Sequence, residues 1–99
     1  MLENDFKTKL AKEIKERFPG AIVTHLDPNE IQGIPDLLVL YKDKWATLEG
    51  KKSEKELKNP RPNQEHYVEK MNNMSFSRFI YPENKEEVLN DLQRTFGIK

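Results

Sequence analysis

Two carboxylates and a lysine mark the part of the sequence that could support a reaction. Asp36 opens an apolar run, and Glu49, Gly50 and Lys51 close the next run, in which side chains alternate between two faces. If a hairpin joins the two runs, antiparallel pairing places Asp36 and Glu49 at the same edge of a sheet. Two carboxylates are hard oxygen ligands suited to Mg²⁺ or Mn²⁺, and the carbonyl of Gly50 could complete the metal shell.

A divalent cation at this edge would favour phosphodiester hydrolysis. It polarises a phosphoryl oxygen, lowers the pKa of a bound water and neutralises charge that develops during in-line displacement. Lys51 falls on the same strand face as Glu49, so its ammonium can orient the attacking water or stabilise the pentacovalent state. Asp36 and Glu49 are therefore predicted metal ligands, and Lys51 the cation that assists the nucleophile.

Periodic patterns predict the elements that position these residues. Apolar residues at helical spacing predict helices over 3–18, over 64–73 and after Pro82, with Asn63 available to cap the second helix. Runs typical of strands cover 21–26, 36–41, 45–51 and 75–81. The run over 36–41 is nearly continuous in apolar residues, which predicts a central strand covered on both faces. The expected order is αβββαβα in one domain spanning residues 1–99.

The stretch between the third strand and the second helix is basic and ends in Asn59-Pro60-Arg61-Pro62. It lacks apolar periodicity, which predicts an irregular loop that is mobile without ligand. Because it adjoins the proposed centre, its cations are candidate DNA contacts, while a solvated surface loop is an equally good interpretation. These candidates are Lys52, Lys55, Lys58 and Arg61.

The strand motifs resemble a known family. Ile34-Pro35-Asp36 followed by Glu49-Gly50-Lys51 looks like the signature of the PD-(D/E)XK nucleases, and the order αβββαβ matches their fold. Within that superfamily, Gly33-Ile34-Pro35-Asp36 is similar to small Holliday-junction-resolvase-type and virus-type replication-repair (VRR-NUC) nucleases. The resemblance covers residues 3–81. It implies an α+β, restriction-endonuclease-like core with a central mixed four-stranded sheet flanked by helices, plus a C-terminal helix.

The resemblance also implies two supporting residues and a partner. Glu3 corresponds to a first-helix glutamate that approaches the metal directly or through water, with Glu13 as the alternative. Gln64 corresponds to a second-helix glutamine that supports the lysine or the scissile phosphate. A homodimer is implied as well, and a second subunit would add apolar burial that a chain of 99 residues lacks.

Composition restricts the other function classes. The chain has no cysteine, which excludes disulfides, thiolate metal sites and a cysteine nucleophile. No apolar run approaches the ~20 residues that a bilayer span requires, so a soluble cytoplasmic protein is expected, in the host cytoplasm if the chain is phage-encoded. Its 17 basic and 17 acidic residues cancel, which argues against a simple coat for nucleic acid. No organic cofactor is expected.

The sequence therefore predicts a Mg²⁺- or Mn²⁺-dependent DNA endonuclease acting in recombination, repair or phage DNA processing. The preferred substrate stays open between a Holliday junction, another branched DNA and plain duplex, and DNA is not distinguished from RNA. One alternative is a non-catalytic nucleic-acid-binding module that retains the nuclease fold. Another is a structural protein in which Asp36, Glu49 and Lys51 form a buried ion-pair network.

Overall fold

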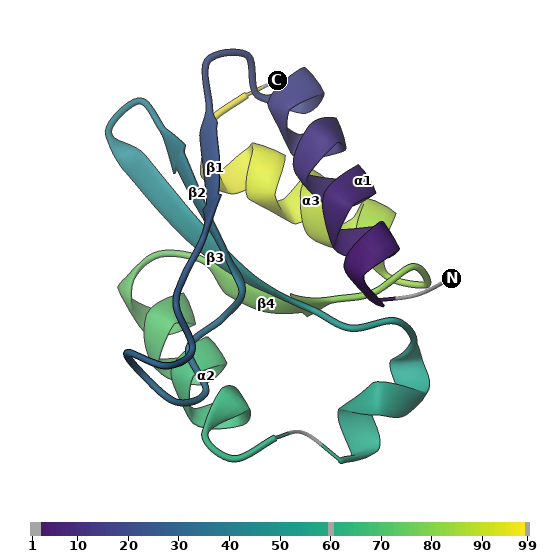
Figure 1. Cartoon of the computed structure of the whole chain (residues 1–99). Helices are drawn as coiled ribbons and strands as arrows, with labels where there is room; N and C mark the ends of the chain where they lie inside the picture. Colours follow the sequence, from purple (N-terminus) through teal and green to yellow (C-terminus); the bar gives the residue numbers. More distant parts are fainter. Residues whose placement is uncertain (1–2, 60, 99) are drawn as a thin grey trace.

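The chain folds as one mixed sheet with helices on both faces (Figure 1). A computed structural model describes residues 3–59 and 61–98, the side chain of residue 3 excepted. The order of helices and strands confirms the prediction, with one short 3-10 helix added. The elements are α1 (Glu3–Arg17), β1 (Ile22–His25), β2 (Leu37–Tyr41), β3 (Lys44–Gly50), η1 (Glu54–Lys58), α2 (Gln64–Met74), β4 (Ser77–Ile80) and α3 (Lys85–Thr95).

The strands lie in the order β1-β2-β3-β4. β1 pairs with β2 and β2 with β3 in antiparallel register, whereas β3 and β4 are parallel because α2 makes the crossover between them. The turn between β2 and β3 contains Lys42 at φ 56°, which directs the chain back along the hairpin. A mixed four-stranded sheet flanked by helices confirms the α+β architecture expected from the sequence.

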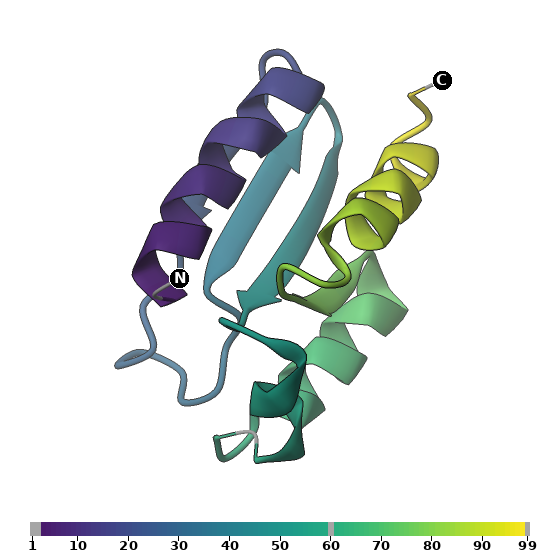
Figure 2. The same ribbon diagram turned by 90° about the vertical axis from the view of Figure 1, so that its right-hand side faces the viewer.

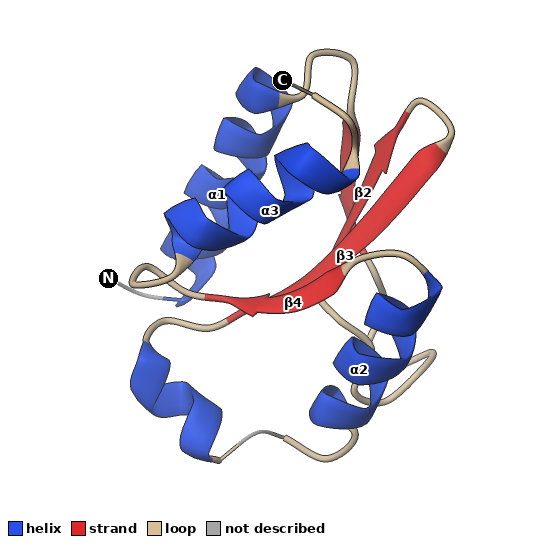
Figure 3. Cartoon of the chain, turned by 180° about the vertical axis from the view of Figure 1, so that it is seen from behind, coloured by secondary structure: helices blue, strands red, loops and turns tan. Residues whose placement is uncertain are grey.

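The apolar core lies between one face of the sheet and the helices α1 and α3, which cross that face side by side (Figures 2 and 3). Phe18 meets Tyr41 and Phe96 edge-on at centroid distances of 5.7 and 5.6 Å, so the aromatic rings join helices and sheet. None of the described helices is long and apolar enough to cross a membrane. The residues buried on this face are Phe6, Leu10 and Ile14 on α1, Phe18 directly after α1, and Val88, Leu89 and Leu92 on α3.

α2 covers the opposite face of the sheet, but only over β3 and β4. There the Thr47 hydroxyl donates to Ser77 Oγ at 2.8 Å, and Val68 of α2 is buried. Beyond α2 the same face is open, and Leu40 of β2 is 38% exposed. The prediction that this strand is covered on both faces is therefore wrong. The apolar residues of β2 on this outer face are half-buried at Leu38 and exposed at Leu40.

Three local predictions also need correction. The segment expected to be an irregular loop contains η1, whose first turn is acidic and last turn basic. Asn63 does stand at the N-cap of α2, yet it adopts a left-handed conformation at φ 68° and makes no capping bond with its side chain. The last helix begins at Lys85 instead of Pro82, because Asn84 first accepts a hydrogen bond from the backbone of Tyr81 in an intervening turn.

Candidate active site

The hairpin between β2 and β3 brings two acidic side chains together at the sheet edge. Leu37 pairs with Leu48, so Asp36 and Glu49 are the next positions along the two strands. The Gly50 N–H donates to Asp36 Oδ2 at 3.2 Å, which fixes the Asp36 carboxylate against the end of β3. The structure thus places Asp36, Glu49 and Gly50 in one cluster.

Glu49 is an unusual carboxyl because it is buried and incompletely hydrogen-bonded. Glu49 is 2% exposed, and its Oε1 atom has no hydrogen-bond partner among the described side chains of residues 4–59 and 61–98. Burial, followed by hydrogen bonding with Asp36 and the charge of Asp36, raises the pKa of Glu49 to about 9. The charges of Lys51 and Lys7 offset only part of this effect.

The pKa of Asp36 is shifted in the opposite direction. Burial acts to raise the pKa of Asp36, but hydrogen bonding with Glu49 and the neighbouring Lys7 outweigh burial and lower it. The pair therefore holds one proton at neutral pH, on Glu49, because two adjacent carboxylates repel when both are ionised. A cation that binds between them must displace that proton.

Lys51 and Gln64 form the second part of the cluster. Lys51 is 4% exposed, and its ammonium donates to Gln64 Oε1 at 2.7 Å. Gln64 Oε1 also accepts a hydrogen bond from the backbone N–H of Arg61, just before α2, at 3.1 Å. This bond fixes the side-chain amide of Gln64, which in turn fixes the Lys51 ammonium. No ion pair among the described residues joins Lys51 to Asp36 or Glu49, and Asp36 pairs instead with Lys7.

A pocket of about 270 Å³ opens beside the two carboxyls. Gly33 lies at φ 88° in its wall, and a Cβ there would stand 2.6 Å from the Cβ of Asn63. A glycine is therefore required where the loop before β2 packs against the loop before α2. The pocket is lined by Pro28, Gln32, Gly33, Ile34, Asp36, Glu49, Arg61, Pro62 and Gln64.

Lys7 is a site residue that sequence reasoning missed. Its ammonium lies 2.8 Å from Asp36 Oδ2, and its side chain is 15% exposed. Lys7 lies on α1 next to the apolar stripe, where the sequence pattern predicts an ordinary surface lysine. Only the packing of α1 across the end of β3 brings it to Asp36, so no local pattern could have identified it.

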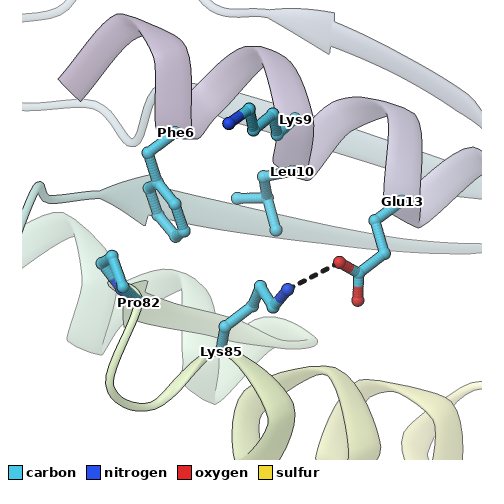
Figure 4. A pocket seen from close by; sticks show the side chains of 6 residues that line it. All are labelled: Phe6, Lys9, Leu10, Glu13, Pro82 and Lys85. Carbon is cyan, nitrogen blue, oxygen red and sulfur yellow. Dashed lines mark hydrogen bonds and ion pairs between the residues drawn. The ribbon is translucent and has the colours of Figure 1, made fainter. Parts of the chain in front are cut away.

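The two candidates for the first-helix acid differ in position. Glu3 begins α1, but its side chain lies outside the described part of the structure. Glu13 faces α3, where the Lys85 ammonium donates to Glu13 Oε1 at 2.7 Å (Figure 4). Arg17 makes a second ion pair with Glu13 at 3.4 Å. Glu13 therefore joins two helices and does not take part in the Asp36 cluster.

The predicted DNA-contacting cations are divided between two places. Arg61 lines the same pocket as Asp36 and Glu49. Lys52 and Lys55 line a separate pocket beside η1, where Lys52 pairs with Glu56 at 3.4 Å. Lys58 is exposed at the end of η1. Arg61 is therefore the member of the set that adjoins the carboxyl pair.

The donor set fits a hard divalent cation. Asp36 and Glu49 supply two carboxyl groups, and the buried Oε1 of Glu49 is an acceptor in need of a partner. Among the side chains that the structure describes, which exclude that of Glu3, no three Asp, Glu or His residues form a group that could hold a metal ion. The described part of the chain thus offers a two-carboxylate site, to which Gly50 can add a carbonyl.

Comparisons with protein-family models, with curated proteins and with solved structures find no match to this chain. The geometry and chemistry of the cluster are therefore the basis for proposing a function.

The Glu49 pKa predicts how stability changes with pH. Because its folded pKa of about 9 exceeds the ordinary value of 4.5, the native state retains a proton that the unfolded state loses. The resulting stability is complete below about pH 4.5 and is lost as pH rises towards 9. Replacing Glu49 by Gln should remove this loss, which amounts to about 1.4 kcal/mol for each unit of pH above 4.5 and therefore to about 5 kcal/mol at pH 8.

Urea titrations between about pH 5 and pH 9 in EDTA measure this effect. The matched control is Glu54→Gln, an exposed position at the start of η1, whose curve should follow the wild type. If Glu49→Gln also follows the wild type at every pH, the buried carboxyl does not hold the proton.

Proposed function

We propose that the protein is a metal-dependent endonuclease that hydrolyses phosphodiester bonds in DNA, with branched DNA such as a Holliday junction as its preferred substrate. The observation that carries the proposal is the pairing of Asp36 with the buried carboxyl of Glu49, whose Oε1 has no hydrogen-bond partner in the described part of the chain, beside Lys51 and an open pocket. The PD-(D/E)XK-like order of these residues supports the same chemistry. Recombination, repair and phage DNA processing are the proposed settings.

In this proposal each residue has a separate task. Asp36 and Glu49 hold Mg²⁺ or Mn²⁺, with the Gly50 carbonyl and Glu3 as further ligands. When bound, such an ion activates water and neutralises charge on the phosphate. Lys51 presents an ammonium to the attacking water or to the charged phosphate oxygens, and Gln64 fixes its direction through the 2.7 Å hydrogen bond. Arg61, in the pocket wall, contacts the DNA backbone.

A panel of labelled substrates tests this function. Four-way junction, flap, nicked duplex, linear duplex, single-stranded DNA and single-stranded RNA are incubated with Mn²⁺, and the cut positions on each strand are mapped. We expect cleavage of at least one branched DNA that EDTA and Asp36→Asn both abolish. Substrates that bind but stay intact at every Mn²⁺ and Mg²⁺ concentration would instead identify a nucleic-acid-binding module.

We propose a second copy of the chain as its protein partner. Ile22, Leu40 and Trp45 are neighbours in register across β1, β2 and β3, on the face that α2 leaves open. Ile22 is 59% exposed and Leu40 is 38% exposed, so this row is a contiguous apolar surface of the kind found at subunit interfaces. Two copies joined through it would carry two active sites, one for each strand of a symmetric branched substrate.

If the chain dimerises through this row, a charged substitution in the row should lower the average molecular mass in solution. Replacing Ile22 by Glu places a charge at the β1 end of the row, its most exposed position, which should weaken self-association by about 100-fold or more. Sedimentation equilibrium measures the effect. Ile31→Glu is the matched control, since Ile31 is also exposed, at 40%, but lies outside the strands. A wild-type protein that sediments as a monomer would contradict the proposed partner.

A further inference from the structure

The Asp36 carboxylate already has a cationic partner within the chain. Lys7 Nζ lies 2.8 Å from Asp36 Oδ2, and exposed fractions of 15% and 27% for the two side chains limit screening by water. The same Oδ2 atom accepts the Gly50 N–H. Asp36 is thus well supplied with donors, whereas the adjacent Glu49 Oε1 has none in the described chain.

The path of the Lys7 side chain depends on the glycine at the end of β3. A Cβ at position 50 would stand 3.0 Å from Lys7 Cγ and 3.1 Å from Lys7 Cε, closer than ordinary packing allows. The methylene chain therefore lies directly on Gly50 and carries the ammonium across the strand end to Asp36. A glycine at position 50 allows the Lys7 side chain to approach the backbone closely, in addition to any contact of the Gly50 carbonyl with a metal.

We propose that Lys7 is a built-in counter-ion that competes with the divalent cation for Asp36 and thereby sets the metal affinity of the site. This inference rests on the proposed function, because it takes the Asp36 and Glu49 pair as the metal-binding position. A cation bound to Asp36 displaces the ammonium, which a lysine permits because its charge is at the end of a flexible stem. Lys7 thus holds the carboxylate in place until metal binds and opposes metal binding at the same time.

The proposal predicts the sign of a charge-removing substitution. Lys7→Met keeps the stem that packs on Gly50 and removes the ammonium, so repulsion of a divalent ion is lost. We expect the dissociation constant for Mn²⁺, measured from the electron paramagnetic resonance signal of free Mn²⁺, to fall by roughly fivefold or more. Lys7→Arg retains the charge and should bind Mn²⁺ within about twofold of the wild type.

Lys12→Met is the matched control, since it removes the same charge from an exposed position on α1. Its Mn²⁺ affinity should stay within about twofold of the wild type. If Lys7→Met binds Mn²⁺ no more tightly than Lys12→Met, or more weakly, Lys7 does not compete for Asp36 and the inference fails. Absence of Mn²⁺ binding in the wild type and in Lys7→Met alike has the same consequence.

The substrate panel separates this result from the proposed function. A wild-type protein that binds Mn²⁺ but cuts no substrate contradicts the nuclease proposal, while the affinity ratio between Lys7→Met and Lys12→Met still decides the role of Lys7. Conversely, cleavage with unchanged affinity in Lys7→Met contradicts only the counter-ion. Thermal unfolding of each variant verifies that the fold is retained.

Discussion

Replacement of Lys51 by Ala is expected to lower the rate of DNA cleavage by at least about 100-fold, because in the proposed mechanism it removes the ammonium that faces the attacking water or the charged phosphate. The folded structure should survive the change. Gln64 Oε1, which loses the Lys51 donor, still accepts the backbone N–H of Arg61 at 3.1 Å. Single-turnover cleavage of the best substrate from the panel, at saturating Mn²⁺, measures the effect.

An exposed lysine on α1 supplies the control for this experiment. Lys12 is exposed and is not one of the predicted site or DNA-contacting residues. Lys12→Ala removes the same charge, and its cleavage rate should remain within about threefold of the wild type, as expected for a surface position. A Lys51→Ala protein that cuts at the wild-type rate would refute the assignment of Lys51.

Metal affinity is expected to rise steeply with pH. Glu49 must lose its proton to ligate a cation, and its pKa is raised to about 9 by burial and by Asp36. Below that value, each unit of pH should therefore change the apparent dissociation constant about tenfold. Between about pH 6 and pH 8 the affinity for Mn²⁺ should increase by roughly 100-fold, with release of about one proton for each ion bound.

Isothermal titration calorimetry in buffers of different ionisation enthalpy measures both the affinity and the number of protons released. Glu49→Gln cannot release this proton, so its Mn²⁺ affinity should be weaker and almost independent of pH. Asp36 contributes little to the pH dependence in this range, because its pKa is lowered and it is already ionised. An affinity for Mn²⁺ that is flat across the range in the wild type would show that Glu49 does not ligate the ion as a carboxylate.

Local pattern was sufficient for most of the fold. The four-residue spacing of Phe6, Leu10 and Ile14 predicted α1, and each of them is buried against the sheet. Alternation in β3 predicted that Thr47 and Glu49 face away from Ala46 and Leu48, and Thr47 does meet β4 under α2 while Ala46 and Leu48 enter the core. Such patterns succeed because they reflect which face of a helix or strand is buried.

The failures have a different origin. Leu40 lies in a nearly continuous apolar run, which predicted a strand covered on both faces, yet Leu40 is 38% exposed. Whether a helix covers the whole sheet or only β3 and β4 depends on the length and placement of α2, and neither follows from the strand sequence. Asn63 also does not cap α2 with its side chain: its backbone is left-handed, in the loop that lies against Gly33.

What the sequence by itself determined is the order of the elements and the meeting of Asp36 with Glu49, since a short hairpin allows its strand ends few other arrangements. Tertiary structure alone decided the partners and protonation of those groups: Lys7 against Asp36, Gln64 against Lys51, Glu13 against Lys85, and the proton on Glu49. The physical reason is the sequence separation of the interacting groups. Backbone pairing within a hairpin is local, whereas burial and charge pairing depend on helices that are far away in the sequence.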